Sequence, residues 1–340
     1  MAYSRAVLAL TLLLAAVPLA LTAPGPAARP NNNNNNNERL LSRVRRIIGN
    51  ADEVNEEEKQ RLFPFSVTIT GSYYVRVPKK IGFITLNVPV KRQVHCGASI
   101  LDRNHVITAA HCLLDEDGDL VASTSWKVYM HSIKRKPSMY ERMKSWFARK
   151  ASKLTGKSIA ENVAHHAHFK KIHIHPSYDK GSILHDVAVI ETSDIRYDQI
   201  SHAGPIGLPP SEVVRADGPT PGTLCDYSGW GCTRPKGSVR EKLLMAQFTV
   251  KPLGDCTSVF QGGDSALWQK NLCVQANRTT VCPGDSGGGL RCEHNGRPYL
   301  AGIASSAATG ANPELYPANF MRITGYISWI RETMALSSAR

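Results

Sequence analysis

Three short segments of the 340-residue chain carry side chains that together could hydrolyse an amide bond. His111 lies in a Thr-Ala-Ala-His-Cys segment, Asp186 precedes Val-Ala-Val-Ile, and Ser286 lies in Gly-Asp-Ser-Gly-Gly. A serine hydroxyl is a weak nucleophile, but an imidazole can accept its proton, and a carboxylate can hold that imidazole in the required tautomer. Alone, each segment also fits a glycine-rich turn or a core residue. Together they predict a nucleophile, a general base and an orienting acid.

The composition is that of an ordinary folded protein with a basic excess. Hydrophobic residues make up 42% of the chain, which excludes a disordered or collagen-like protein as a whole. The 41 Lys and Arg exceed the 28 Asp and Glu, so the net charge is +13. This charge favours acidic partners or surfaces, but it does not by itself indicate nucleic acid. We expect no nucleic-acid partner.

The N-terminal residues have the pattern of a secretion signal. Arg5 precedes an apolar run over residues 7–21 that is too short to span a bilayer comfortably. A signal peptide over residues 1–22 is therefore favoured over a membrane anchor. Residues 23–46 are rich in Pro and contain seven consecutive Asn, so we expect a disordered propeptide there. Since no later apolar run reaches about 18 residues, we expect a secreted, extracellular protein without a transmembrane segment.

Eight cysteines follow the N-terminal segment. An even number in a secreted chain indicates four disulfides, although spacing alone does not select the pairs. A zinc site is the weaker interpretation, because the chain has no Cys-x-x-Cys pair. His165, His166 and His168 could also suggest a metal site. We expect neither a metal nor another cofactor.

Taken together, the three segments resemble those of the trypsin/chymotrypsin family of serine endopeptidases. The resemblance runs from about Ile47 to the C-terminus, and four further segments carry it: His95-Cys96-Gly97-Ala98-Ser99, His175-Pro176-Ser177-Tyr178-Asp179, Ser228-Gly229-Trp230-Gly231 and Ile327-Ser328-Trp329-Ile330. It implies an all-β, chymotrypsin-like fold of two antiparallel six-stranded β-barrels, over about residues 62–195 and 205–322, with the catalytic cleft between them. It also implies a C-terminal helix over about residues 323–335. The same helix is indicated by the apolar spacing of Ile323, Tyr326, Ile327 and Ile330.

The resemblance implies a role for each residue of the site. Ser286 would be the nucleophile, His111 the general acid and base, and Asp186 its partner. Ser305 would support Asp186 with a hydrogen bond. The backbone N–H groups of Gly284 and Ser286 would form the oxyanion hole, where glycine lets the backbone approach the substrate closely. The expected activity is hydrolysis of peptide bonds in protein or peptide substrates through an acyl-enzyme.

The segment Arg46-Ile47-Ile48-Gly49-Asn50 resembles the activation site of zymogens in this family. Cleavage after Arg46 would free the amine of Ile47, which would then pair with Asp285 inside the protein. Asn50 replaces the usual second glycine, a mild departure. Arg43-Val44-Arg45-Arg46 also resembles a furin- or kexin-type processing site. We therefore expect a protease of that type to activate the chain in the secretory pathway.

The resemblance implies four disulfides. Three of them are usual in the family, namely Cys96–Cys112, Cys225–Cys292 and Cys256–Cys273. The family usually pairs the cysteine at position 282 with one in a later loop, which this chain lacks. We therefore expect a non-standard fourth bridge, Cys232–Cys282.

The primary specificity pocket departs from that of trypsin-like members, which carry Asp at its floor. Thr280 stands there in this chain, and Ala307 and Ala318 occupy wall positions near Ser305. A neutral floor would leave a bound Lys or Arg without a countercharge, and two added methyl groups would narrow the pocket. We expect a preference for small or medium aliphatic side chains. Asn277, three residues before Thr280, begins the one sequon for N-glycosylation.

Two segments are longer than their family counterparts. Residues 132–171 hold 11 Lys and Arg against two Glu, a net charge of +9. Apolar residues from Met139 to Leu154 recur at helical spacing, so we expect a helical insertion on the barrel surface. Its charge leaves open an exosite for an anionic glycan, a membrane surface or an acidic protein. Gly71 to Lys91 predicts a long hairpin that shapes the substrate side rather than forming a site.

We therefore predict a secreted serine endopeptidase, with the protease domain over residues 47–340. The main alternative is a catalytically weak or silent homologue that binds partners through its basic insertion. The intact set of His111, Asp186 and Ser286 disfavours that alternative. The chain order and the activation site disfavour an esterase of another fold.

Overall fold

A computed structural model of the chain describes residues 51–115, 117–123, 125–130, 133–134, 143, 165–232, 240–260, 267–309 and 312–338. The chain divides into two units, residues 1–42 and 43–340, and every described residue belongs to the second. The predicted signal peptide and propeptide, including Arg46, lie outside the described residues, as does Ile47.

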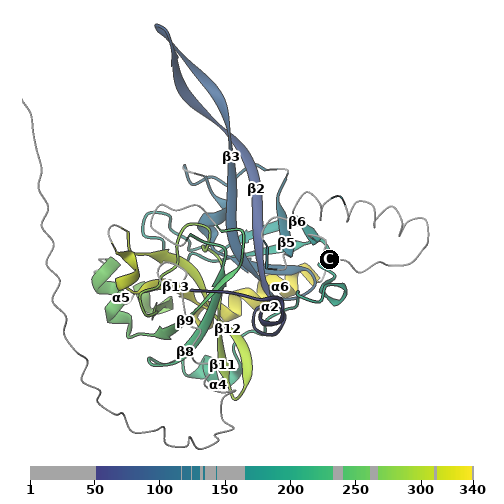
Figure 1. Ribbon diagram of the computed structural model, residues 1–340, viewed down its shortest axis with the longest axis vertical. Helices are drawn as coiled ribbons and strands as arrows, with labels where there is room; N and C mark the ends of the chain where they lie inside the picture. The colour runs from purple at the N-terminus through teal and green to yellow at the C-terminus, as the bar shows by residue number, and fades with distance from the viewer. Residues whose placement is uncertain are drawn as a thin grey trace, which may run out of the picture. The chain divides into compact units, whose positions relative to one another are not determined.

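Six antiparallel strands close the first barrel in the order β2-β3-β4-β7-β6-β5 (Figure 1). They are β2 (Ser66–Ile81), β3 (Ile84–Ile100), β4 (His105–Thr108), β5 (Lys127–Met130), β6 (His165–Ile174) and β7 (Ala188–Thr192). β4 is buried at every position, and Val106 and Ile107 are fully inaccessible. β-Branched side chains of this kind pack well on a pleated surface, which is why the segment forms a core strand.

The second barrel closes in the order β9-β10-β13-β12-β11-β8, since β8 also pairs with β9. Its strands are β8 (Leu224–Gly229), β9 (Leu244–Val250), β10 (Asn271–Gln275), β11 (Gly289–His294), β12 (Arg297–Ala307) and β13 (Ala318–Arg322), and β1 (Asp52–Glu53) adds to β9. Inside, the rings of Tyr227, Phe248 and Phe320 lie 5.6 to 6.1 Å apart between centroids. The predicted pair of six-stranded barrels is confirmed.

Short helices join the strands. They are α2 (Glu56–Leu62), η1 (Ala110–Leu113), η2 (Tyr197–Gln199), α4 (Ser211–Arg215), α5 (Leu253–Phe260), η3 (Leu267–Lys270), η4 (Pro313–Leu315), η5 (Ile323–Tyr326) and α6 (Ile327–Ser338). α2 begins with a capping box, in which Asn55 and Glu58 each accept a hydrogen bond from the other's backbone N–H. None of the described helices is long and apolar enough to cross a bilayer.

The C-terminal helix is confirmed, with a 3₁₀ turn, η5, preceding α6. The four side chains whose spacing predicted its inner face are all buried, with exposed fractions between 0% and 8%: Ile323, Tyr326, Ile327 and Ile330. α6 packs against β7 of the first barrel, and η5 packs against β12 and η3. The helix therefore closes the first barrel's core near the strand that follows Asp186.

The two long segments have different outcomes. The segment from Gly71 to Lys91 forms the predicted hairpin of β2 and β3, paired in register from Ser66 with Ser99 to Ile81 with Ile84. The helix predicted within residues 132–171 lies outside the described residues except for Met143. The last seven residues of this segment, 165–171, belong to β6 of the first barrel.

Candidate active site

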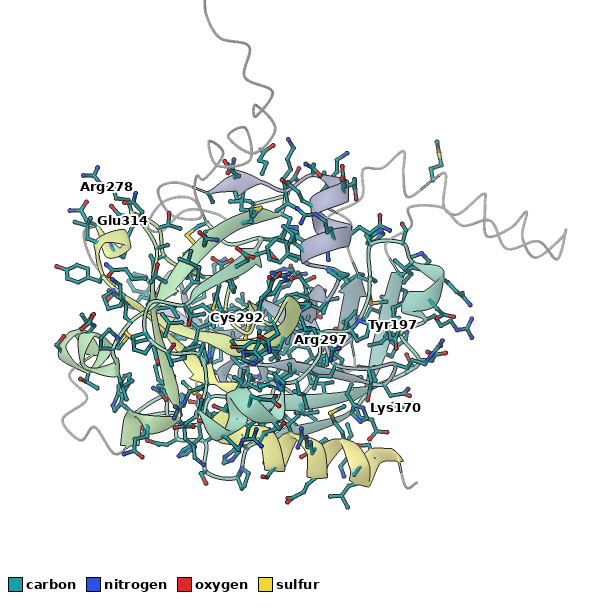
Figure 2. All side chains as sticks on the ribbon, turned by 90° about the horizontal axis from the view of Figure 1, so that it is seen from below. Lys170, Tyr197, Arg278, Cys292, Arg297 and Glu314 are labelled. Carbon is teal, nitrogen blue, oxygen red and sulfur yellow. A yellow bond between two sulfur atoms is a disulfide. The ribbon has the colours of Figure 1, made fainter. Side chains whose placement is uncertain are left out.

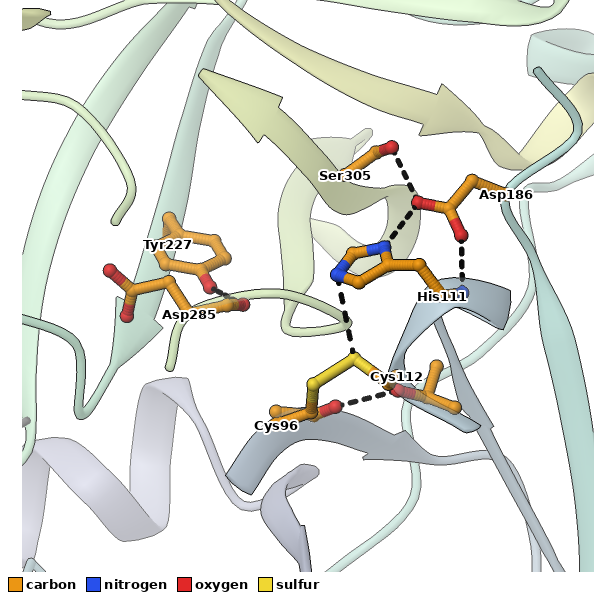
Figure 3. Close-up of a disulfide and its surroundings, with 9 residues drawn as sticks. Cys96, His111, Cys112, Asp186, Tyr227, Asp285 and Ser305 are labelled. Carbon is orange, nitrogen blue, oxygen red and sulfur yellow. Dashed lines mark hydrogen bonds and ion pairs between the residues drawn. A yellow bond between two sulfur atoms is a disulfide. The ribbon is translucent and has the colours of Figure 1, made fainter. Parts of the chain in front are cut away.

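His111 and Asp186 are brought together by the closure of the first barrel. His111 lies on η1 directly after β4, and Asp186 lies just before β7, the strand that pairs with β4. His111 Nδ1 lies 2.7 Å from Asp186 Oδ2, and the backbone N–H of His111 donates to Asp186 Oδ1 at 2.8 Å (Figure 3). The imidazole is thus held in one orientation by the carboxylate.

Asp186 is fully buried, and Ser305 of β12 supplies a third hydrogen bond to it. The Ser305 hydroxyl donates to Asp186 Oδ2 at 2.6 Å. A buried carboxylate needs such donors, because removing its charge from water is costly. Since Ser305 belongs to the second barrel and Asp186 to the first, the bond also joins the two barrels at the site.

The pKa of His111 reflects two opposed effects. Burial lowers it by penalising the imidazolium, whereas the hydrogen bond and the charge of Asp186 raise it. The raising effects prevail, so the pKa of His111 lies above its usual value of 6.5. An imidazole of this kind is suited to accept a proton near neutral pH.

Ser286 lies on the loop before β11, and this loop is docked on β3. The carbonyl of Ser286 accepts a hydrogen bond from Gly97 N–H at 2.7 Å. Gly287 has a φ of 80°, and any side chain there would collide with Thr108. Among the described residues, no hydrogen bond joins Ser286 to His111. Instead, His111 Nε2 lies 3.8 Å from Cys112 Sγ (Figure 3).

Asp285, the residue before Ser286, is a buried acid at 1% exposure. Its carboxylate accepts hydrogen bonds of 2.9 Å from the backbone N–H groups of Gly231 and Cys282, and its carbonyl accepts one from the Tyr227 hydroxyl at 2.6 Å. Burial raises the pKa of Asp285 to about 7, although the two N–H donors lower it. No cation pairs with this carboxylate within the described part of the chain.

Two residues around Asp285 were not predicted to take part in the site. A side chain at Gly231 would overlap the Asp285 carboxylate, so only glycine fits that close approach. Tyr227 lies on the inner face of β8, where its ring packs in the second barrel and its hydroxyl reaches the Asp285 carbonyl. The alternation of Cys225, Tyr227 and Gly229 along that strand was the available signal for the inward orientation.

The residues predicted for the specificity pocket and the oxyanion hole lie on or between strands of the second barrel. Ala307 and Ala318 face each other as a register pair between β12 and β13. Thr280 is 1% exposed, and its hydroxyl has no hydrogen-bond partner among the described residues. Gly284, predicted for the oxyanion hole, has a φ of 99°, a conformation that favours glycine.

The structure contains the four expected disulfides, Cys96–Cys112, Cys225–Cys292, Cys232–Cys282 and Cys256–Cys273. The first joins β3 to η1 beside His111. Within the described residues, Cys96, His111 and Cys112 are the one cluster of metal-type ligand atoms. Because both sulfurs are bonded to each other, neither is the thiolate that zinc requires.

The sequon lies on the surface. Asn277 and Arg278 are exposed in the turn that follows β10, and the Thr279 hydroxyl donates to the Asn277 carbonyl at 3.3 Å. Figure 2 shows Arg278 at the periphery of the domain, directed outward. An attached glycan would therefore have room on this side.

Comparisons with known proteins agree on one family. A family model described as Trypsin matches residues 79–330. The chain is 27% identical over 71% of its length to "CLIP domain-containing serine protease B4" of Anopheles gambiae, and the match covers 62% of that protein. It is 26% identical over 71% of its length to human "Cathepsin G" and to "Chymotrypsin-like elastase family member 1" of Macaca fascicularis, covering 77% and 79% of them. A solved structure described as "Structure of GrC" superposes with a TM-score of 0.58 at 21% identity, over 84% of this chain and 98% of that one.

Proposed function

Because the chain belongs to the trypsin family and is thus a serine endopeptidase, we propose that Ser286, His111 and Asp186 carry its reaction. The observation that supports this most directly is the bond from His111 Nδ1 to the fully buried Asp186 carboxylate. That bond leaves Nε2 as the nitrogen that can exchange a proton with the substrate side. It also disfavours the alternative of a silent binding protein.

The proposed reaction is the triad mechanism of the family. Ser286 Oγ attacks the scissile carbonyl carbon and passes its proton to His111 Nε2, while Asp186 stabilises the imidazolium. The oxyanion accepts hydrogen bonds from the N–H groups of Gly284 and Ser286. Nε2 then protonates the departing amine, and water hydrolyses the acyl-enzyme by the same proton path.

The proposed switch is cleavage after Arg46. Asp285 is buried in a neutral peptide environment, with its pKa raised to about 7. A new amine at Ile47 would supply the missing cation, and the charged pair would hold the loop that carries Ser286. A furin- or kexin-type protease is the proposed activator.

Primary specificity is proposed to be for small or medium aliphatic side chains. Thr280 is neutral and buried, so a Lys or Arg in the pocket would lack a countercharge. Ala307 and Ala318, which pair across β12 and β13, are the proposed wall residues, and their methyl groups would narrow the pocket. Thr280→Asp is expected to admit basic side chains.

We also propose that the protein is secreted and that Asn277 is glycosylated. Residues 132–171 are proposed to bind an anionic glycan or an acidic surface. These proposals are supported by the apolar N-terminal run, the exposed turn at Asn277 and the net charge of +9 in the insertion.

Labelling with a fluorophosphonate probe tests the proposal. The secreted protein is labelled before and after cleavage at Arg46, with Ser286→Ala as the control. Labelling is expected only after cleavage and only with Ser286 present, and peptides with Ala or Val before the scissile bond should be cleaved faster than those with Arg. Cleaved, folded protein that takes up no probe would refute the catalytic assignment.

A further inference from the structure

The hairpin of β2 and β3 extends as a two-stranded ribbon. β2 pairs with β5 only as far as Thr70, and β3 pairs with β4 only at Ser99 and Ile100. Among the described residues, no third strand joins the ribbon between Gly71 and His95. At roughly 3.3 Å per residue its length is about 35 Å, and Figure 1 shows it running well past the other strands of the barrel.

The tip of this ribbon is apolar and exposed. Gly82, with a φ of 61°, and Phe83 form a two-residue turn between the strands. Phe83 is fully exposed, and Ile84 and Leu86 are 63% and 49% exposed. Single exposed apolar residues are common on soluble proteins, but three together at the apex of a projecting ribbon indicate an interaction site.

The two faces of the ribbon differ. Residues paired across an antiparallel ribbon share a face, and one face carries Val75 with Val90 and Val77 with Val88, all half-buried. The other face carries exposed polar pairs, among them Tyr74 with Lys91 and Lys80 with Thr85. The valine face also carries Lys79 opposite Leu86 and Arg92 opposite Tyr73, but it is the more apolar of the two faces, and it leads to Ile84 at the exposed tip.

The charge of the ribbon has one sign. Residues 71–95 contain no Asp or Glu, and their five basic side chains are Arg76, Lys79, Lys80, Lys91 and Arg92, all exposed. Lys79 and Lys80 flank the tip directly. Lys80 pairs with Thr85 and Lys79 with Leu86, so Phe83 and Ile84 lie beyond both lysines and Leu86 lies level with Lys79. Apolar side chains at the apex, with lysines that start one pair behind Ile84, match the layering of an anionic membrane, whose phosphates lie above its acyl chains.

We propose that this ribbon docks the protein on an anionic phospholipid membrane. Phe83, Ile84 and Leu86 enter the boundary between headgroups and acyl chains, and Lys79 and Lys80 bind the lipid phosphates. Docked in this way, the disulfide beside His111 lies about 40 Å from the surface, at roughly 3.3 Å for each of the residues from Ile84 to Cys96.

A membrane fits the tip better than a protein does. A stable protein interface buries about 800 Å² on each partner, more than the side chains of Phe83, Ile84 and Leu86 present at the tip. Addition of a foreign strand along the ribbon's edges is disfavoured by Pro78 and Pro89, which lack an N–H, and by the lysines near them.

Vesicle sedimentation tests the proposal without using peptidase activity. The full secreted protein is mixed with phosphatidylcholine vesicles that contain or lack phosphatidylserine. We expect binding only to the anionic vesicles, weaker at high salt. Phe83→Ser with Ile84→Ser should weaken it at least ten-fold, and Lys80→Glu about ten-fold. Phe83→Trp should keep the affinity and add a blue-shifted fluorescence component with anionic vesicles.

Matched controls lie on α6, where Leu336 is 63% exposed and Arg331 is also exposed. Leu336→Ser and Arg331→Glu repeat the apolar and charge changes away from the ribbon and should leave binding unchanged. Circular dichroism melting verifies that every variant is folded. No binding to anionic vesicles, equal losses in the ribbon and control variants, or binding to heparin or acidic proteins but not vesicles would each overturn the proposal.

Discussion

Neutralising Asp285 is expected to change how the stability of the uncleaved chain depends on pH. Burial raises the pKa of this carboxyl group to about 7 from an ordinary 3.8, against the lowering effect of two N–H donors. Between these values the folded chain holds a proton that the unfolded chain has released. The free energy of unfolding therefore falls as the pH rises from about 4 to about 7. The loss is at most about 4 kcal/mol, at about 1.4 kcal/mol for each unit of difference.

Urea unfolding of Asp285→Asn and its parent measures this loss. Both carry Arg46→Gln so that the chain stays uncleaved, and unfolding is followed at several pH values between about 4 and 8. Asparagine keeps the shape of the side chain but cannot ionise, so its stability relative to the parent should rise by about 3–4 kcal/mol across this range. Its altered hydrogen bonding to Gly231 or Cys282 adds only an offset that does not vary with pH.

Cleavage after Arg46 should reverse the direction in which the Asp285 contribution to stability changes with pH. Once the Ile47 amine pairs with the carboxylate, the pKa of Asp285 would fall below its unfolded value, and its stabilisation would be present above about pH 4 and lost in acid. Asp285→Asn should then destabilise the cleaved protein near neutral pH. If the unfolding free energies of parent and variant changed with pH in parallel in the uncleaved chain, the burial argument would be refuted. If the pH dependence of their difference kept its direction after cleavage, the activation proposal would be refuted. Exposed Asp255 provides the control, Asp255→Asn.

Three further results are expected. Ser305→Ala removes a 2.6 Å hydrogen bond from the buried Asp186 carboxylate, so the free energy of unfolding should drop by about 2 kcal/mol in urea titrations, with a lower kcat/KM. Gly231→Ala places a methyl group against the Asp285 carboxylate, which should cost about 3 kcal/mol or more and reduce the yield of secreted, folded protein. Asn277→Gln should remove one glycan from the secreted protein, seen as a shift in electrophoretic mobility that glycosidase treatment of the parent reproduces.

The two stability predictions, for Gly231→Ala and Ser305→Ala, each have a matched control variant. Gly254→Ala introduces a methyl group where nothing lies within 4 Å, so it should leave stability nearly unchanged. Ser306→Ala, one residue along β12, removes a hydroxyl that receives only a 3.3 Å bond from Asn319. If Ser306→Ala matched Ser305→Ala in its effect, the role given to the Asp186 bond would be wrong.

The two barrels were expected from the family resemblance, and that resemblance could be found because the segments that carry it are short and local. His111, Asp186 and Ser286 each lie in a short segment with few alternatives, and the apolar spacing of the C-terminal helix needs no distant partner. The surroundings of Asp285 could not be predicted in the same way. Tyr227 and Gly231 are 58 and 54 residues from it in sequence, and they meet it only because the second barrel closes.

The strand formed by residues 165–171 was not predicted, for a related reason. Residues 165–171 are rich in His and Lys, and their charge matched that of the preceding segment. In β6, however, Ala167 is buried, whereas His166 and His168 on either side of it are exposed. A barrel strand with one solvent-exposed face can be strongly basic, so composition alone did not reveal where β6 begins.

The short strand β1 limits how far the new N-terminus at Ile47 could move after cleavage. It fixes Asp52 against Met245, and five residues, 47–51, separate it from the bond after Arg46. Cleavage would thus create a tethered ligand confined within roughly 17 Å of its anchor, at ~3.4 Å per residue. Its effective concentration would reach the millimolar range typical of short linkers. An amine held that close needs only modest intrinsic affinity for Asp285, so hydrolysis of one bond can drive the switch to completion however dilute the protein is.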